Sequence, residues 1–384
     1  MSDIYKGRTN VPMADDSTNA RGRIYNENEQ IDISEEEKRQ LLSNIRAMVN
    51  MHTLCDECWT EAISSQNFLV DLAFELKMTR DETFKNLLNI FLLSFSPQFS
   101  GGFKLNDRNV LIIPNENQKL IECMLKEDQD DPYYHGALEA KKIVHPDRIY
   151  KNYLYGLMVN IATATVNSQL SNVFDHCINE LLSDEALDKD RGGWYHYRLP
   201  WITARILLGF HNILKNDRLT LNIIDKIEKL YNKGLSSLIE RIYDNKYWRS
   251  GAGEWVSKWE STGLCLEAFL TSTEALRDQR YIVRINDVMS YLFKDGIVNE
   301  WLPKTIDFST ENSTNTLLAQ VVLCSVLYRY IKLPEWKKYE KYCKEIGDFF
   351  ISCMSELSKE SSVIVRQFCT IPQILLYIVR AIKE

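Results

Sequence analysis

Three acidic residues that precede apolar, helix-like stretches are the residues in this sequence most able to do chemistry. They are Glu254, Glu260 and Asp307, which we take as candidate catalytic residues. If the helices begin at one common mouth, these carboxylates converge there and can act as acid and base, as in glycoside hydrolysis. Exchanging each for its amide is then expected to abolish turnover and leave stability nearly unchanged. The alternative is that they are capping and first-turn residues that stabilise the helices.

Aromatic, cationic and imidazole side chains near the same helix starts could bind a ligand. Helix amino ends carry partial positive charge, which favours anionic groups, and indole rings could stack on a sugar or a prenyl group. The alternative for the tryptophans is packing between neighbouring helical hairpins. The candidate ligand-binding residues are Trp194, His196, Arg198, Trp255 and Arg366.

One group of residues has the spacing of a metal site. His52, Cys55 and Cys58 form a His-x-x-Cys-x-x-Cys pattern, and imidazole and thiolate are ligands that zinc prefers. On a continuous helix, however, residues at this spacing point in progressively different directions around the helix. No fourth ligand stands nearby in the sequence. Buried thiols are the alternative. Apart from this zinc hypothesis, the sequence indicates no cofactor.

The elements that would position these residues are helices of two kinds. Threonines lead mostly uncharged apolar stretches at intervals of about 55 residues, a period long enough for two helices with their turns. Charged amphipathic stretches lie between them, which suits an outer layer around a buried inner one. The leading residues are Thr203, Thr262, Thr314 and Thr370, and the charged helices are expected over 219–243, 279–293 and 335–357.

This pattern predicts an all-α fold of repeated helical hairpins with inner and outer helix layers. The hairpins form either an α/α-toroid or an open or closed α-solenoid. We expect a flexible polar tail over 1–33 and a single helical-repeat domain over 34–384. Within that domain, 34–149 is irregular, with an insertion near 96–117 that allows a hairpin, and 150–384 holds the regular hairpins.

The layering resembles the α/α-toroid folds, such as terpenoid cyclases and six-hairpin glycosidases. The closest passage runs from Gly253-Glu254-Trp255 to Leu264-Cys265-Leu266, and it looks like the Gly-x-Trp turn and helix start of cyclase repeats. The resemblance covers roughly 150–384 and implies an active site in the cup at the inner-helix amino ends. Asp128-Gln129-Asp130-Asp131 matches the acid motif of class II terpenoid cyclases, but it stands in a polar loop and not at a helix start.

Composition narrows the function further. A net charge of −7 without any basic block weighs against nucleic acid and anionic membranes as partners. We see no secretory signal and no bilayer-spanning stretch, and the nine scattered cysteines are typical of reduced thiols. These features favour the cytoplasm. No nucleophile elbow or phosphate-binding loop occurs.

Because no specific catalytic motif is present, we predict a helical-repeat interaction or regulatory subunit of a larger cytoplasmic assembly. It would bind another protein, in part through the polar tail. The alternative is an α/α-toroid enzyme that acts on a sugar, an isoprenoid or a peptide. An enzyme needs converging carboxylates or histidines in a concave pocket, whereas a scaffold would present a large exposed apolar face.

Overall fold

The computed structural model describes residues 32–55, 200–214, 221–249, 257–272, 275–359 and 370–383, with residues 72, 75 and 76 and strands β1 to β4. The chain divides into two units, Met1–Gln30 and Ile31–Glu384, and all described residues belong to the second. Of these residues 78% are helical, which confirms the predicted all-α class. The α-helices are α1 (Glu35–Cys55), α8 (Pro200–Leu214), α9 (Leu221–Glu240), α10 (Lys258–Leu270), α11 (Gln279–Leu292), α12 (Val298–Trp301), α13 (Glu311–Tyr330), α14 (Cys343–Lys359) and α16 (Ile371–Lys383), and η2 (Pro334–Tyr342) is a 3-10 helix.

Among the described residues, three short antiparallel strand pairs interrupt the helices. β1 (Lys104–Leu105) pairs with β2 (Leu111–Ile112) inside the segment where the sequence allowed a hairpin. Two further pairs were not predicted from the sequence, because each strand is only two residues long and gives no alternating pattern. They are β3 (Leu187–Asp188) with β4 (Gly193–Trp194), and β5 (Ile242–Tyr243) with β6 (Tyr247–Trp248).

The predicted charged helices are present, but two of them have different bounds. The first ends at Glu240 because the chain turns there into the β5–β6 hairpin. Asp244 and Asn245 in that turn have φ values of 49° and 56°, which these residue types tolerate better than most. The third is split into η2 and α14, and Pro334, which lacks an N–H, stands at the start of η2.

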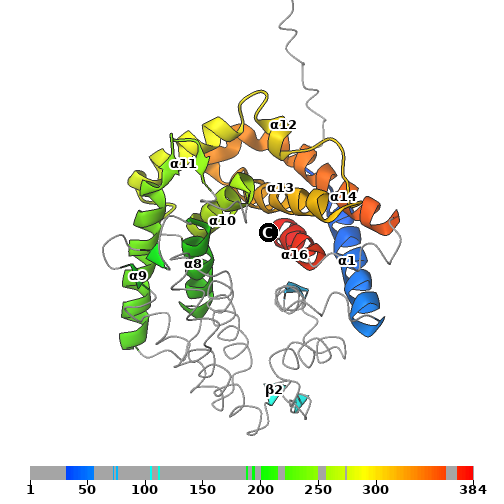
Figure 1. Ribbon diagram of the computed structural model, residues 1–384, viewed down its shortest axis with the longest axis horizontal. Helices are drawn as coiled ribbons and strands as arrows, with labels where there is room; N and C mark the ends of the chain where they lie inside the picture. The colour runs from blue at the N-terminus through cyan, green and yellow to red at the C-terminus, as the bar shows by residue number, and fades with distance from the viewer. Residues whose placement is uncertain are drawn as a thin grey trace, which may run out of the picture. The chain divides into compact units, whose positions relative to one another are not determined.

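Four helices make up the buried layer, and they pack against one another in sequence order. α10 packs between α8 and α13, and α13 packs on its other side against α16. Figure 1 shows these four helices together, with α9, α11 and α14 outside them. In α10 every residue from Trp259 to Phe269 is buried, and in α13 every residue from Val321 to Tyr330. This burial explains why the corresponding sequences are nearly free of charge.

The closest approach of two buried helices lies at Gly263. A Cβ atom at this position would stand 3.0 Å from the backbone N and Cα of Leu323 in α13. Only a residue without a side chain lets the two backbones come this near. Gly263 therefore sets the packing of α10 on α13.

Tryptophans connect the outer elements to the core. Trp248 and Trp301 are fully buried, and their indole N–H groups donate to the carbonyl oxygens of Leu238 and Leu292 at 2.7 and 2.9 Å. Trp336 is also fully buried and donates to Asn286 of α11 at 2.8 Å. Each ring fills apolar space while its polar atom is satisfied, so these three tryptophans are structural.

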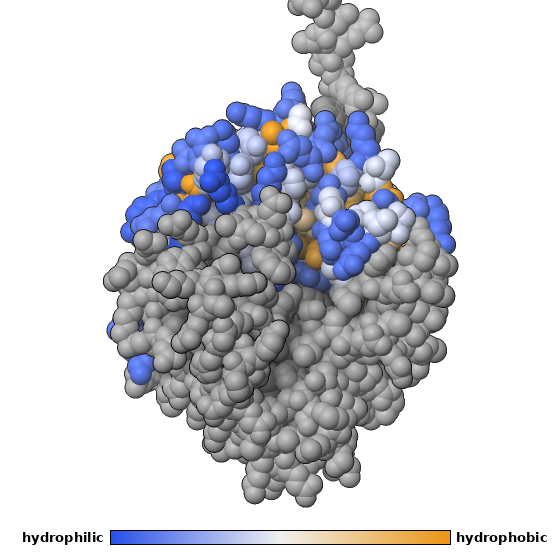
Figure 2. All heavy atoms as spheres, viewed as in Figure 1, coloured by the Kyte–Doolittle hydropathy of each residue, from blue (hydrophilic) through white to orange (hydrophobic). Residues whose placement is uncertain are grey.

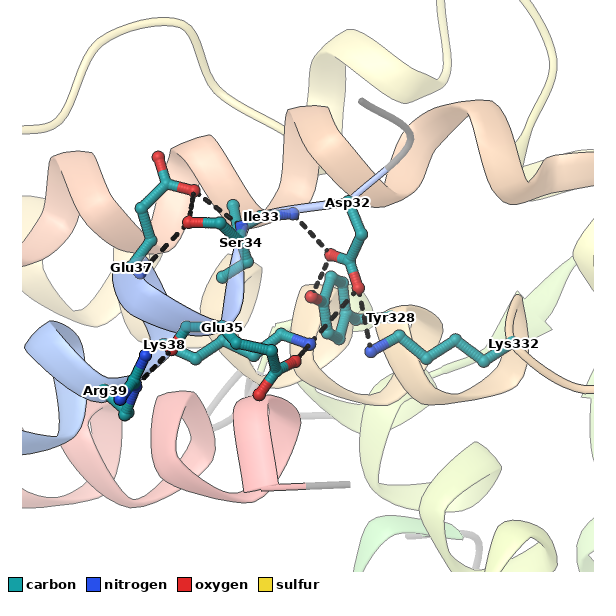
Figure 3. Close-up of polar contacts among 9 residues, drawn as sticks. All are labelled: Asp32, Ile33, Ser34, Glu35, Glu37, Lys38, Arg39, Tyr328 and Lys332. Atoms are coloured by element: carbon teal, nitrogen blue, oxygen red, sulfur yellow. Dashed lines mark hydrogen bonds and ion pairs between the residues drawn. The ribbon is translucent and has the colours of Figure 1, made fainter. Parts of the chain in front are cut away.

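The first described helix is tied to the last ones. α1 packs on α14 and α16, and Ile33, just before it, lies 3% exposed against Gly347 of α14. Asp32 accepts a hydrogen bond from Tyr328 and pairs with Lys332 at 3.3 Å and Lys38 at 3.6 Å (Figure 3). The predicted tail therefore ends with two residues that contact α13 and α14.

No helix among the described residues is long and apolar enough to cross a membrane. Four cysteines of this part of the chain, Cys265, Cys324, Cys343 and Cys353, are free and buried. Burial raises the pKa of each thiol, to about 12 for Cys343. They are packed as small apolar side chains with unreactive protonated thiols.

Candidate functional site

The predicted catalytic acids have very different surroundings. Glu260 lies in the first turn of α10, is 7% exposed, and accepts a hydrogen bond from Arg205 of α8 at 3.2 Å. Burial raises the pKa of its carboxyl, although the charge of Arg205 opposes this shift. Asp307 is exposed in the loop before α13 and accepts from the backbone N–H of Ser309 at 2.7 Å, and hydrogen bonds with Ser309 lower its pKa. Glu254 lies outside the described residues.

The structure does not join these acids into a pair. Within the described residues, no hydrogen bond or ion pair connects Glu260 with Asp307. Glu260 instead has a cationic partner, which suits an ion pair inside the core. Asp307 accepts from a backbone N–H two residues on within the loop, and the N-cap of α13 is Thr310.

The other predicted site residues cannot be assembled into a site. Trp194 belongs to strand β4, but its side chain, like His196, Arg198, Trp255 and Arg366, lies outside what the structure describes. The same holds for the proposed zinc ligands, which are His52, Cys55 and Cys58. His52 and Cys55 are in the last turn of α1, and their side chains and Cys58 are not described. The described residues contain no group of three His, Cys, Asp or Glu side chains able to hold a metal ion.

Charged residues from all four buried helices form a second feature, which we call the inner charge cluster. Glu267 of α10 is 2% exposed and accepts from Arg329 of α13 at 2.9 Å, and Arg380 of α16 stands 3.5 Å away. The cluster consists of Arg205, Glu260, Glu267, Arg329, Tyr377 and Arg380.

Tyr377 of α16 is buried, and the charges of both ion pairs affect the pKa of its hydroxyl. Its pKa is raised, first by burial and then by the charge of Glu267, while the charges of Arg380 and Arg205 oppose the shift. Glu260 also acts on it.

Sequence reasoning found only Glu260 of this cluster. A usable signal was nevertheless present, because Glu267 and Arg329 are each a single charge inside a long apolar stretch. A charge is buried only when it has a partner. Two such residues of opposite sign in neighbouring buried helices therefore predict an ion pair, as observed.

The β5–β6 hairpin carries a third feature, a group of rings and cations that we call the hairpin surface. Tyr247 contacts the rings of Tyr243, Trp259 and Tyr291 at centroid distances of 5.5, 6.4 and 6.1 Å. Tyr243 is 40% exposed. The cations of this surface are Lys246 over Tyr291, Arg249 over Tyr243, and Lys258 over Trp259 and Tyr247.

Comparisons with protein-family models, with curated proteins and with solved structures found no match to this chain.

Proposed function

We propose that this protein is the interaction subunit of a cytoplasmic assembly and that it binds an acidic segment of a partner protein on the hairpin surface. The observation that carries the proposal is the exposed stack of Arg249 on Tyr243, with the guanidinium carbon 3.4 Å from the ring centroid. Tyr, Trp and Arg are the residue types that dominate binding energy at protein interfaces. The hairpin surface brings these three types together.

The positive charge of the hairpin surface favours a partner protein that carries acidic residues. Cations outnumber acids here: within the described residues, the three cations Lys246, Arg249 and Lys258 have two acidic ion-pair partners, Asp244 and Glu300. Figure 2 shows a largely hydrophilic surface over the described residues on the face in view. A partner that offers carboxylates complements this charge and would also be steered toward it.

The Arg249 side chain is held ready for such a carboxylate. Stacking fixes the plane of its guanidinium, and within the described residues its N–H groups make no hydrogen bond or ion pair. A planar guanidinium group that is already ordered loses little conformational entropy when it binds a carboxylate through two parallel hydrogen bonds. This arrangement favours binding through Arg249 over binding through the lysines, which already lie close to acidic groups.

The helices are proposed to form a two-layered α/α-toroid or solenoid that displays this surface. The order α8, α10, α13, α16 in the buried layer supports repeated hairpins. The packing of α1 against α14 and α16 supports closure, since the first described helix then meets the last ones. The hairpin surface follows an outer helix directly, so it sits at the turn between two hairpins.

The test is purification of the untagged protein from its own host, followed by native mass spectrometry. We expect a second protein at fixed stoichiometry that is lost with Arg249→Glu and with Tyr243→Ala. Lys337→Glu is the matched control, because it reverses an exposed cation on η2. A chain that purifies alone, or a partner that stays bound to both hairpin variants, would contradict the proposal.

An α/α-toroid enzyme is the second candidate, and Glu260 favours it. A buried carboxyl with a raised pKa next to an arginine is an arrangement found at active sites, although structural ion pairs also show it. A screen of sugars, isoprenoids and peptides for turnover tests this candidate. Turnover that Glu260→Gln abolishes would support it, and turnover that is unaffected would exclude Glu260 as the acid.

A further inference from the structure

The two residues that precede the capping serine of α1 contact α13 and α14 through side chains of opposite character. Asp32 accepts a hydrogen bond from Tyr328 of α13 and pairs at 3.3 Å with Lys332, which follows α13 (Figure 3). The side chain of Ile33 is buried against Gly347 of α14. We call the surface formed by Tyr328, Lys332 and Gly347 the α13–α14 site. It therefore holds an acidic residue and the apolar residue that follows it.

The apolar part of this site exists because position 347 has no side chain. A Cβ atom on Gly347 would stand 2.5 Å from Cγ2 and 3.3 Å from Cγ1 of Ile33, so the isoleucine occupies the space that a larger residue would fill. Ile33 is 3% exposed in this position. The space over Gly347 thus accepts a branched apolar side chain.

The polar part of the site binds a carboxylate. Tyr328 donates to Oδ1 of Asp32, and the ammonium group of Lys332, which lies 3.9 Å from the centre of the Tyr328 ring, pairs with Oδ2. Oδ1 also accepts from the backbone N–H of Ile33 at 2.8 Å, which orients the acidic side chain relative to the next residue. A phenol hydroxyl and an ammonium group together favour a carboxylate over a neutral side chain.

Asp32 and Ile33 can leave the site while α1 stays in place. The first turn of α1 is completed by its own residues, because the N–H of Ser34 donates to Oε2 of Glu37 at 2.6 Å and the N–H of Glu37 donates to Oγ of Ser34 at 3.2 Å. The side chains in the ion pair between Lys332 and Asp32 are 30% and 29% exposed, so solvent screens this pair. Release is therefore a local opening that breaks no hydrogen bond of the helix.

We propose that the α13–α14 site is a docking site for a segment of a partner protein in which an acidic residue directly precedes a branched apolar residue. Asp32 and Ile33 have this chemistry and occupy the site as an internal competitor, so a partner segment binds by displacing them. Because the internal pair is tethered next to the site, its effective concentration is high, and weak competitors are excluded. This surface is separate from the hairpin surface, and the proposal does not depend on the function proposed above.

The experiment is fluorescence anisotropy of a fluorescein-labelled peptide with the sequence of residues 29–38, titrated with the full chain. The Asp32→Ala/Ile33→Ala variant lacks the internal competitor and should bind the peptide saturably and at least about tenfold more tightly than the wild type. Peptides that carry Asp32→Asn or Ile33→Ser should bind this variant about tenfold more weakly, because each has lost one part of the recognised pair. Ile33→Ala alone is a milder change to the chain, and it should also bind the peptide more tightly than the wild type does.

Gly347→Ala, added to either variant of the chain, should abolish peptide binding, because the new methyl group takes the space of the isoleucine side chain. Ser352→Ala is the matched control, since it lies exposed on the same helix, and it should leave the affinity unchanged. The proposal is overturned if the peptide binds neither the double variant nor Ile33→Ala, or if it binds the wild type as tightly as it binds these variants. Peptide binding that survives Gly347→Ala would also overturn it.

Discussion

At the scale of single residues, burial separates two carboxylates that look alike in the sequence. Glu260 is enclosed between α8 and α10 and is bound by Arg205, whereas Asp307 is exposed in a loop. We therefore expect amide exchange to leave stability nearly unchanged at Asp307. At Glu260 we expect a loss of stability instead, because a buried charged hydrogen bond would be lost.

Glu260→Gln is expected to lower the free energy of unfolding by about 1.5 to 3 kcal/mol, the usual worth of a hydrogen bond to a charged group. Asp307→Asn should change it by less than about 0.5 kcal/mol, because an asparagine side chain can still accept from Ser309. Urea denaturation at pH 7 measures both. Equal stability losses in the two variants would show that burial does not distinguish these acids.

At the scale of elements, the contact between α10 and α13 depends on the absence of a side chain at Gly263. Gly263→Ala should destabilise the protein by about 1 to 3 kcal/mol, because the new methyl group meets the backbone of Leu323, which cannot move aside. The better helix propensity of alanine offsets only part of this loss.

Asn315→Ala is the matched control, since it places the same residue at an exposed position of α13. It should be neutral or slightly stabilising. Thermal unfolding followed by circular dichroism compares the two variants. A Gly263→Ala protein as stable as the control would mean that the two backbones do not approach closely.

At the scale of the whole molecule, Asp32 connects the start of α1 to α13 through a hydrogen bond with Tyr328 and an ion pair with Lys332. Burial raises the pKa of its carboxyl, but the hydrogen bond from Tyr328 and the charges of Lys332 and Lys38 outweigh this and hold the pKa below 3.8. A carboxyl with a lowered pKa contributes stability above its unfolded pKa, and this contribution is lost as pH falls through the folded value.

Asp32→Asn should therefore reduce the free energy of unfolding by about 1 kcal/mol at pH 7. The gap between the variant and the wild type should narrow as the pH falls below 3.8, where the wild-type carboxyl becomes protonated as well. Guanidinium chloride denaturation at pH 7 and pH 3 tests this. A gap of the same size at both values would show that the charge of Asp32 does not stabilise the fold.

The sequence by itself determined the all-α class and the places of the main helices. The spacing of apolar residues and the capping residues at helix ends are local signals that extend over a few positions of the chain. It also marked the segment with the first hairpin. It missed the end of the helix at Glu240, where the chain turns into a hairpin, and the change from a 3-10 helix to an α-helix after Tyr342.

Only the tertiary structure decided which charged residues meet. Glu267 and Arg329 are 62 positions apart in the chain, and Arg380 comes from a third buried helix, so no spacing rule relates them. Likewise, the rings around Tyr247 come from β5, α10 and α11. Helix formation depends on residues that are neighbours along the chain. A site depends on which helix faces pack together, and this packing is determined by how the whole core is buried.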